Sequence, residues 1–176
     1  MDIHLLSNVL NKVASKHYLA TGQECAELLS LSKYLQVYSS CSPRAMVPLT
    51  SELMLFRSYL GLLNRYHEQS IQLTEKIDAG LPSFELPAGL CSQVMRLLTQ
   101  TSLMDVRDLR QVEVALAASG LSLGLVFERA PERSGWGQDP AFEASATRLA
   151  DELKSVAPGF WKIKAAPDRV SIAWWP

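Results

Sequence analysis

The sequence predicts an α+β protein, in which an antiparallel helical hairpin is followed by a two-layer α/β module. Three observations predict this class. Apolar residues recur every three or four positions over residues 1–38, and the period becomes two at residues 71–77. Two pairs of strand-like runs follow, at residues 111–128 and 160–175, each interrupted by a turn. Helices that precede a mixed layer of strands and helices are typical of two packed modules.

The first two helices are predicted from apolar stripes with coiled-coil-like spacing. Residues 20–22 end the first helix, and the short connection makes the pair an antiparallel hairpin. The first stripe contains Ile3, Leu6, Leu10 and Val13, with His17 next, and the second contains Leu28, Leu31, Leu35 and Tyr38. Because two helices cannot enclose their own stripes, we expect a homodimeric four-helix bundle. This module is expected at residues 1–45, and the α/β module at residues 46–176.

The elements of the second module are predicted from caps, turns and changes of period. Two prolines in residues 42–48 break the helix, and Thr50-Ser51-Glu52 offers an N-terminal cap for a third helix. Apolar spacing predicts further helices at residues 88–104 and 141–156. Residues 129–140 contain two glycines and two prolines, which predict an exposed loop.

Composition excludes several classes of function. The formal net charge is −1 and no basic stripe is present, which argues against a nucleic-acid-binding protein. No apolar run approaches the roughly 20 residues that cross a bilayer, and no signal peptide is evident, so we expect a cytoplasmic protein. Cys25, Cys41 and Cys91 lack metal-type spacing and are interpreted as reduced structural thiols. Neither His17 nor His67 has the neighbours that a metal site requires, so no metal is expected.

Four motifs then recur in order and resemble the core of LytS-type sensor histidine kinases. Residues 2–11 read Asp-Ile-His-Leu-Leu-Ser-Asn-Val-Leu-Asn, similar to that family's Asn-Pro-His-Phe-Leu-Phe-Asn-x-Leu-Asn. Residues 31–39 resemble its Leu-Ser-x-Leu-Leu-Arg-Tyr-Ser pattern, residues 47–53 its Val-x-Leu-x-x-Glu-Leu start, and residues 57–60 its Arg-x-Tyr-Leu core. The resemblance implies dimerisation and phosphoacceptor helices followed by a GHKL-type ATP-binding domain.

The same resemblance implies that the nucleotide site is degenerate. Aligning Pro87 with the proline that opens the family's Asn-containing helix puts Arg96 and Leu97 at the positions of its Glu and Asn. Neither side chain can coordinate Mg²⁺, which requires oxygen ligands. The family's Asp-x-Gly-x-Gly is replaced by Glu-Arg-Ala-Pro at residues 128–131, and residues 142–147 hold no glycine. We therefore expect the fold to persist without ATP or another cofactor, which leaves the assignment as an enzyme open.

His4 is then the candidate catalytic residue, as the phosphoacceptor that the resemblance implies. On the first helix it falls beside the apolar stripe, where a ring nitrogen can stay accessible. Asn8 lies one turn later and is expected to support the imidazole. Asp2 is a plausible N-cap that would place His4 among free backbone amides. The alternative is that His4 is an inherited but inert surface residue.

The resemblance implies a non-catalytic two-component signalling protein. In the favoured interpretation, His4 relays a phosphoryl group to or from a response-regulator receiver domain. In the alternative, the chain is a pseudokinase scaffold that binds a receiver domain or a histidine kinase without phosphotransfer. An active histidine autokinase is the least favoured interpretation. The partners expected are therefore a receiver domain, a histidine kinase and a second copy of the chain, with no nucleic acid and no membrane.

Overall fold

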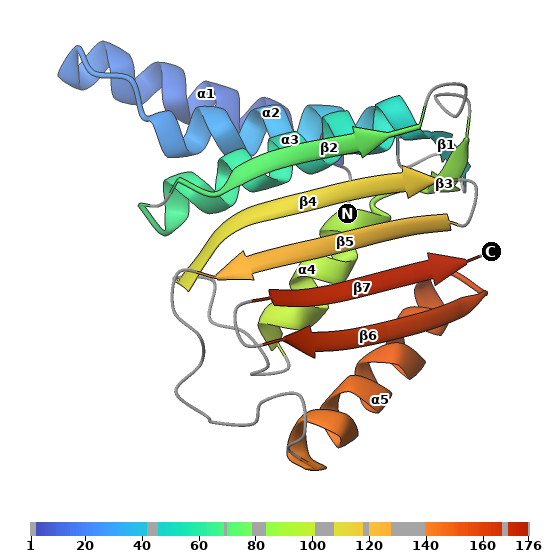
Figure 1. Ribbon diagram of the computed structural model, residues 1–176. Helices are drawn as coiled ribbons and strands as arrows, with labels where there is room; N and C mark the ends of the chain where they lie inside the picture. Colours follow the sequence, from blue (N-terminus) through green and yellow to red (C-terminus); the bar gives the residue numbers. More distant parts are fainter. Residues whose placement is uncertain are drawn as a thin grey trace.

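The helical hairpin lies beside an α/β layer in a computed structural model of the chain (Figure 1). The structure describes residues 3–41, 46–68, 70–78, 84–100, 108–117, 120–127, 140–166 and 169–175. Its helices are α1 (Ile3–Thr21), α2 (Ala26–Cys41), α3 (Leu49–Tyr66), α4 (Leu90–Gln100) and α5 (Pro140–Val156). The predicted α+β class is confirmed, and each predicted helix has a counterpart.

Five strands form a mixed sheet in the order β2-β4-β5-β7-β6. Their bounds are β2 (Gln72–Ile77), β4 (Leu109–Ala117), β5 (Gly120–Phe127), β6 (Phe160–Ala166) and β7 (Arg169–Trp175). β2 pairs with β4 in parallel, and the other pairs are antiparallel. Two three-residue strands, β1 (Met46–Pro48) and β3 (Glu85–Pro87), pair separately. The sequence did not predict these two, because three residues are too few to display a period.

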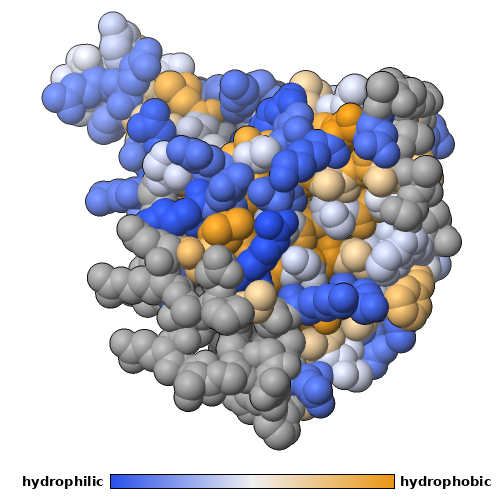
Figure 2. Space-filling view, viewed as in Figure 1, coloured by the Kyte–Doolittle hydropathy of each residue, from blue (hydrophilic) through white to orange (hydrophobic). Residues whose placement is uncertain are grey.

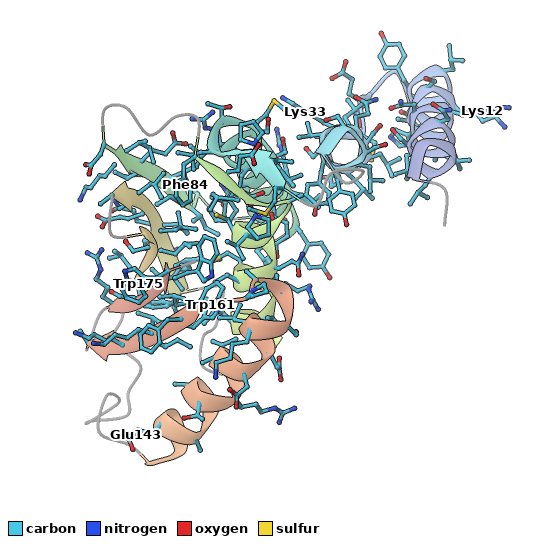
Figure 3. All side chains as sticks on the ribbon, turned by 90° about the vertical axis from the view of Figure 1, so that its right-hand side faces the viewer. Lys12, Lys33, Phe84, Glu143, Trp161 and Trp175 are labelled. Atoms are coloured by element: carbon cyan, nitrogen blue, oxygen red, sulfur yellow. The ribbon has the colours of Figure 1, made fainter. Side chains whose placement is uncertain are left out.

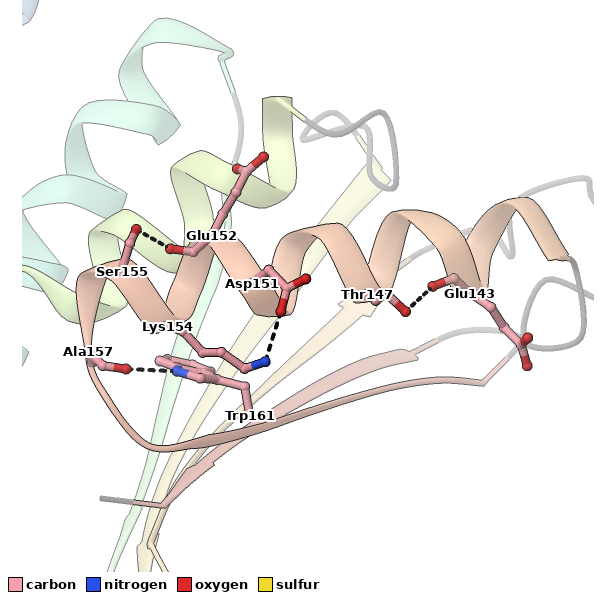
Figure 4. Close-up of polar contacts among 8 residues, drawn as sticks. All are labelled: Glu143, Thr147, Asp151, Glu152, Lys154, Ser155, Ala157 and Trp161. Atoms are coloured by element: carbon pink, nitrogen blue, oxygen red, sulfur yellow. Dashed lines mark hydrogen bonds and ion pairs between the residues drawn. The ribbon is translucent and has the colours of Figure 1, made fainter.

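Alternation along the strands separates a helix-covered face from an open face. From Val112 onward in β4 and throughout β7 every second residue is buried, as the period of two predicts. The buried side chains meet α3, α4 and α5, which cover one face of the sheet (Figures 1 and 3). Trp161 points from β6 toward α5, where its indole Nε1 donates to the carbonyl oxygen of Ala157 at 3.0 Å (Figure 4). The core of the α/β layer therefore lies between sheet and helices.

The open face of the sheet carries a small ion network. Glu113 on β4 accepts from the Arg169 guanidinium at 2.5 Å and lies 3.5 Å from the Lys76 ammonium nitrogen. The Arg169 side chain crosses Gly124 on β5, where a Cβ atom would overlap the guanidinium. Figure 2 shows this face, where polar and apolar residues alternate. Arg169 is thus held by a carboxylate.

The hairpin extends away from the sheet as two successive layers of helix. α2 packs against both α1 and α3, whereas α1 packs mainly against α2 (Figure 3). The helix contact differs from the predicted stripe: Ser7 and Ala14 of α1 are buried, whereas Val13 is 47% exposed. Small side chains allow the two helices to approach closely, and Leu6 and Leu10 of the predicted stripe are only half-buried. The expected dimeric bundle stays a prediction.

The start of α3 corrects another prediction. Pro48 occupies the N-cap position and no side-chain hydrogen bond caps the helix there, so Thr50-Ser51-Glu52 is not the cap. Proline is favoured at helix starts because its fixed φ angle is compatible with a first turn and its missing N–H is not needed there. Glu52 instead turns into the protein, with no exposed surface.

Candidate functional site

The candidate phosphoacceptor lies at the outer helix of the hairpin. His4 is in the first turn of α1, and Asn8 follows one turn later with an exposed side chain. Asp2, the predicted cap, lies outside the described residues, as does the side chain of His4. The predicted support of the imidazole by Asn8 therefore stays a prediction, but the helical spacing of the two residues is as expected.

A polar cluster that the sequence analysis missed joins α1 to α2. Ser32 on α2 donates to the Asn11 side-chain oxygen at 2.7 Å, and its hydroxyl oxygen lies 3.2 Å from that of Ser7. Both serines are buried. Because a buried hydroxyl needs a partner, this cluster fixes the register of the hairpin. Asn11 was visible in the sequence, but only the packing of α1 on α2 distinguishes its role from that of Asn8.

The rest of α1 is unusually apolar for an outer helix. Val9 and Val13 are about half exposed, and Tyr18 and Leu19 are exposed near the tip of the hairpin. Lys12 points away from the rest of the chain (Figure 3). Exposed apolar side chains gathered on one element are typical of a surface that another protein covers.

The helix that the sequence resemblance aligns with a nucleotide-binding helix is α4 (Leu90–Gln100). Arg96 is exposed on it, whereas Leu97 is 7% exposed and belongs to the hydrophobic core. Among the described residues, no three His, Cys, Asp or Glu side chains gather as a metal site. Residues 128–131 lie outside the described ranges. The two positions that the resemblance aligns with Mg²⁺ ligands thus carry an exposed cation and a core leucine.

The segment at residues 142–147 forms the first turns of a regular helix. Thr147 donates its hydroxyl hydrogen to the carbonyl oxygen of Glu143 at 2.8 Å, one turn earlier in α5 (Figure 4). Asp151 and Lys154 form an ion pair of 2.8 Å further along α5. These contacts are local to the helix.

Glu52 occupies the amino end of α4 from inside the protein. Its two carboxylate oxygens accept from the backbone amides of Gly89 and Cys91 at 2.6 and 2.7 Å. Burial raises the pKa of Glu52 above its usual value, and the two amide hydrogen bonds act in the opposite direction. Burial, with the nearby Glu52 carboxylate, also raises the pKa of the Cys91 thiol well above its usual value. Cys91 is thus an inert, buried thiol, as the sequence predicts for the cysteines.

A cavity of about 520 Å³ opens between the hairpin and the α/β layer. α2 contributes Tyr34, Leu35 and Tyr38, α3 contributes Tyr59, and the segment that begins α4 contributes Gly89, Ser92, Gln93 and Arg96. Burial, with smaller contributions from Tyr38, Tyr59 and Glu52, raises the pKa of Tyr34 to about 12. Burial also raises the pKa of Tyr59, and the charge of Arg96 opposes that shift. Tyr34 and Tyr59 are therefore neutral hydroxyls at physiological pH.

Comparison with known proteins finds similarity only among solved structures. No protein-family model matches the sequence, and no curated protein sequence matches it. The blue-light activated histidine kinase of Erythrobacter litoralis EL346 is similar over 97% of this chain and 59% of its own length, with 14% identity and a TM-score of 0.47. The chain thus spans less than two thirds of that kinase.

Two further solved structures are similar over most of their length. The Acinetobacter baumannii histidine kinase AdeS is matched over 99% of this chain and 85% of its own, with 10% identity and a TM-score of 0.44. A bacterial phosphotransferase is matched over 95% of this chain and 85% of its own, with 10% identity and a TM-score of 0.46. Because all three TM-scores are below 0.5, the function proposed below rests on the chain's own residues.

Proposed function

We propose that the protein is a two-component signalling protein in which His4 relays a phosphoryl group to or from a receiver-domain aspartate. The observation that carries the proposal is the sequence of α1, which places a histidine and Asn8 one turn apart on a helix joined to α2 as a hairpin. The four motifs at residues 2–60 support the same assignment. We further propose that the protein acts in the cytoplasm, where receiver domains occur.

The proposed transfer needs only a nucleophile and a phosphorylated partner. A neutral imidazole nitrogen of His4 attacks the phosphorus of an aspartyl phosphate, an N–P bond forms, and the O–P bond to the aspartate breaks. The receiver recovers its carboxylate, and the imidazole loses its N–H proton to water. The reverse sequence returns the phosphoryl group to a receiver. No nucleotide takes part in either direction.

The character of α4 supports a relay rather than an autokinase. Phosphoryl transfer from ATP depends on metal ions that bridge the phosphates and on oxygen ligands that hold them. Arg96 and Leu97 supply no such oxygen, and the Leu97 side chain packs in the hydrophobic core. An autokinase would bind Mg²⁺-ATP, so a flat calorimetric titration with Mg²⁺-ATP is expected, and saturable binding would favour the autokinase.

The relay is tested by phosphotransfer from phosphorylated receiver domains of the same genome. We expect the protein to acquire an acid-labile, alkali-stable label, and His4→Gln to abolish it. His17→Gln is the matched control, because His17 is an exposed histidine on the same helix and should leave the label unchanged. A label that survives His4→Gln, or no label with any receiver, would contradict the relay.

A scaffold without phosphotransfer is the second candidate function, and the exposed apolar side chains of α1 favour it. Val9 and Val13 are about half exposed and lie one turn apart on α1, which suits a helical partner. We propose that a second copy of the chain covers Val9 and Val13, so that α1 and α2 of the two copies form a four-helix bundle by dimerisation. Sedimentation should therefore give a dimer for the wild type and a monomer for Val13→Lys. A scaffold would keep its partner binding in His4→Gln and lose it in Val13→Lys, whereas a monomeric wild type would exclude the bundle.

A further inference from the structure

The cavity between α2, α3 and α4 is not used by the proposed relay. Its volume of about 520 Å³ falls within the range of roughly 300–1,000 Å³ typical of small-molecule sites. α2 belongs to the hairpin, and α3 and α4 belong to the α/β layer, so the cavity lies where the two modules meet. An occupant would touch both of them.

Three tyrosine rings make the apolar wall of this cavity. The ring centroids of Tyr34 and Tyr38 are 6.0 Å apart with an interplanar angle of 36°, and those of Tyr34 and Tyr59 are 5.9 Å apart at 52°. Tilted rings at this spacing present both faces and edges to the space between them. A flat aromatic ring can therefore add to the cluster in offset or edge-to-face contact.

Ser92 lines the cavity and carries a buried hydroxyl without a hydrogen-bond partner among the described residues. Ser92 is only 6% exposed, and its Oγ forms no hydrogen bond within the part of the chain that the structure describes. A buried polar group left in this state costs free energy, and such groups in folded proteins are usually satisfied. A ligand oxygen that accepts from Ser92 would supply the missing partner. Gln93, the next residue of α4, adds a side-chain amide to the same wall.

The positive charge in the cavity wall favours an anionic ligand. Arg96 lies one turn after Ser92 on α4 and is the charged residue among those that line the cavity. The nearby carboxylate of Glu52 has no exposed surface, and its oxygens are already engaged by the amides of Gly89 and Cys91. The amino end of α4 is therefore occupied by the protein's own carboxylate, and Arg96 is the group that would hold an anion.

We propose that this cavity binds a small, planar aromatic carboxylate, with its ring among Tyr34, Tyr38 and Tyr59 and its carboxylate between Arg96 and Ser92. Tyrosine clusters also bind organic cations, but the guanidinium of Arg96 in the wall opposes a cation. The proposal is independent of the relay, because it concerns a different surface and a non-covalent ligand. A ligand held by both α2 and α4 would fix the hairpin against the α/β layer.

The test is a titration of the full chain with 2-naphthoate, followed by backbone amide chemical shifts. From the binding efficiency per atom typical of drug-sized ligands, a probe of this size should bind with a Kd of ~1 mM. The amides of Gly89, Ser92 and Gln93 should shift and saturate together. The neutral probe 2-naphthamide and the cation 2-naphthylmethylammonium should each bind at least about fivefold more weakly, because they lose the charge-assisted contact with Arg96.

Two variants and a matched control assign the site. Arg96→Gln should weaken 2-naphthoate binding about fivefold or more, and Ser92→Ala about threefold. Arg148→Gln removes an exposed arginine from α5 that does not line the cavity, and should leave the Kd unchanged. The proposal is overturned if no shifts saturate, if the amide or the cation binds as tightly as the carboxylate, or if Arg148→Gln has the effect expected of Arg96→Gln.

Discussion

The buried carboxylate of Glu52 provides the sharpest test of how the α/β layer is held together. It joins α3 to the start of α4 by accepting two backbone amide hydrogen bonds, at 2.6 and 2.7 Å. Glu52→Ala removes both acceptors and leaves two buried N–H groups without partners. Because each unsatisfied donor costs about 1–3 kcal/mol and the lost side chain leaves a void, we expect the free energy of unfolding to fall by about 3–5 kcal/mol.

Glu52→Gln separates the hydrogen bonds from the charge. The glutamine oxygen can accept from one amide, but its NH₂ group opposes the second N–H. Because glutamine is uncharged, the variant does not bear the cost of burying a carboxylate, and this offsets part of that loss. We therefore expect a decrease of only about 1–2 kcal/mol in the free energy of unfolding. Glu152→Ala is the control, because Glu152 forms only an exposed ion pair with Arg148 and should change stability by less than about 0.5 kcal/mol.

The pH dependence of stability tests the same buried carboxyl group. Because the pKa of Glu52 is raised in the folded state, the folded protein holds this proton more tightly than the unfolded chain does. Its contribution to stability is therefore fully present below the ordinary glutamate pKa and is lost as pH rises through the raised pKa. Urea unfolding at several pH values should show this decline in the wild type, and Glu52→Gln should lack it. Equal stabilities of the Ala and Gln variants and the wild type would refute the assigned role of Glu52.

Four further substitutions test particular contacts by urea unfolding. Gly159→Ala should cost about 2–4 kcal/mol, because Gly159 has a φ of +142° and an added Cβ meets a β7 carbonyl oxygen. Gly124→Ala should cost less than about 1 kcal/mol, since only the flexible Arg169 guanidinium must move; equal losses would contradict this. Ser92→Ala should raise stability by about 1 kcal/mol by removing an unsatisfied hydroxyl, and a loss would show that Oγ has a partner. The Arg169 hydrogen bond lowers the pKa of Glu113, so the wild type should lose stability as pH falls below the ordinary glutamate pKa. Glu113→Gln should not show this loss. A variant with the same acid profile as the wild type would argue against the pair.

The elements that were predicted correctly are those with a strong local period. The alternation in β7 and in most of β4 follows from which side chains face the core. The apolar spacing of α1 and α2 predicts that both are helices, but it does not predict which side chains of α1 lie against α2. The strands β1 and β3 were missed because each has three residues and pairs over a long sequence separation.

Contacts between distant segments could not be predicted. Glu52 looked like a local helix cap, but its partners, Gly89 and Cys91, lie 37 and 39 residues further along the chain. The α1–α2 contact was expected at the apolar stripe, yet the buried positions include Ser7 and Ser32, because small residues allow close approach. Their mutual hydrogen bond becomes visible only when both helices are in place.

The candidate site, too, could be predicted only in part from the sequence. The helical spacing of His4 and Asn8 follows from sequence alone, as does the chemical unsuitability of Arg96 and Leu97 for Mg²⁺. The cavity could not be predicted, because its wall combines Tyr34 with residues of α3 and α4 that meet only in the folded chain.

The central claim is that His4 carries a phosphoryl group. The most direct measurement is site-localising mass spectrometry of the intact protein after incubation with a phosphorylated receiver domain, with peptides kept at alkaline pH to preserve phosphohistidine. If His4 is the relay residue, we expect a phosphoryl group on the peptide that contains His4, and none on the peptides that contain His17 or His67. A phosphoryl group on either of those histidines, or an unmodified His4 while the receiver loses its phosphoryl group to the protein, would contradict it.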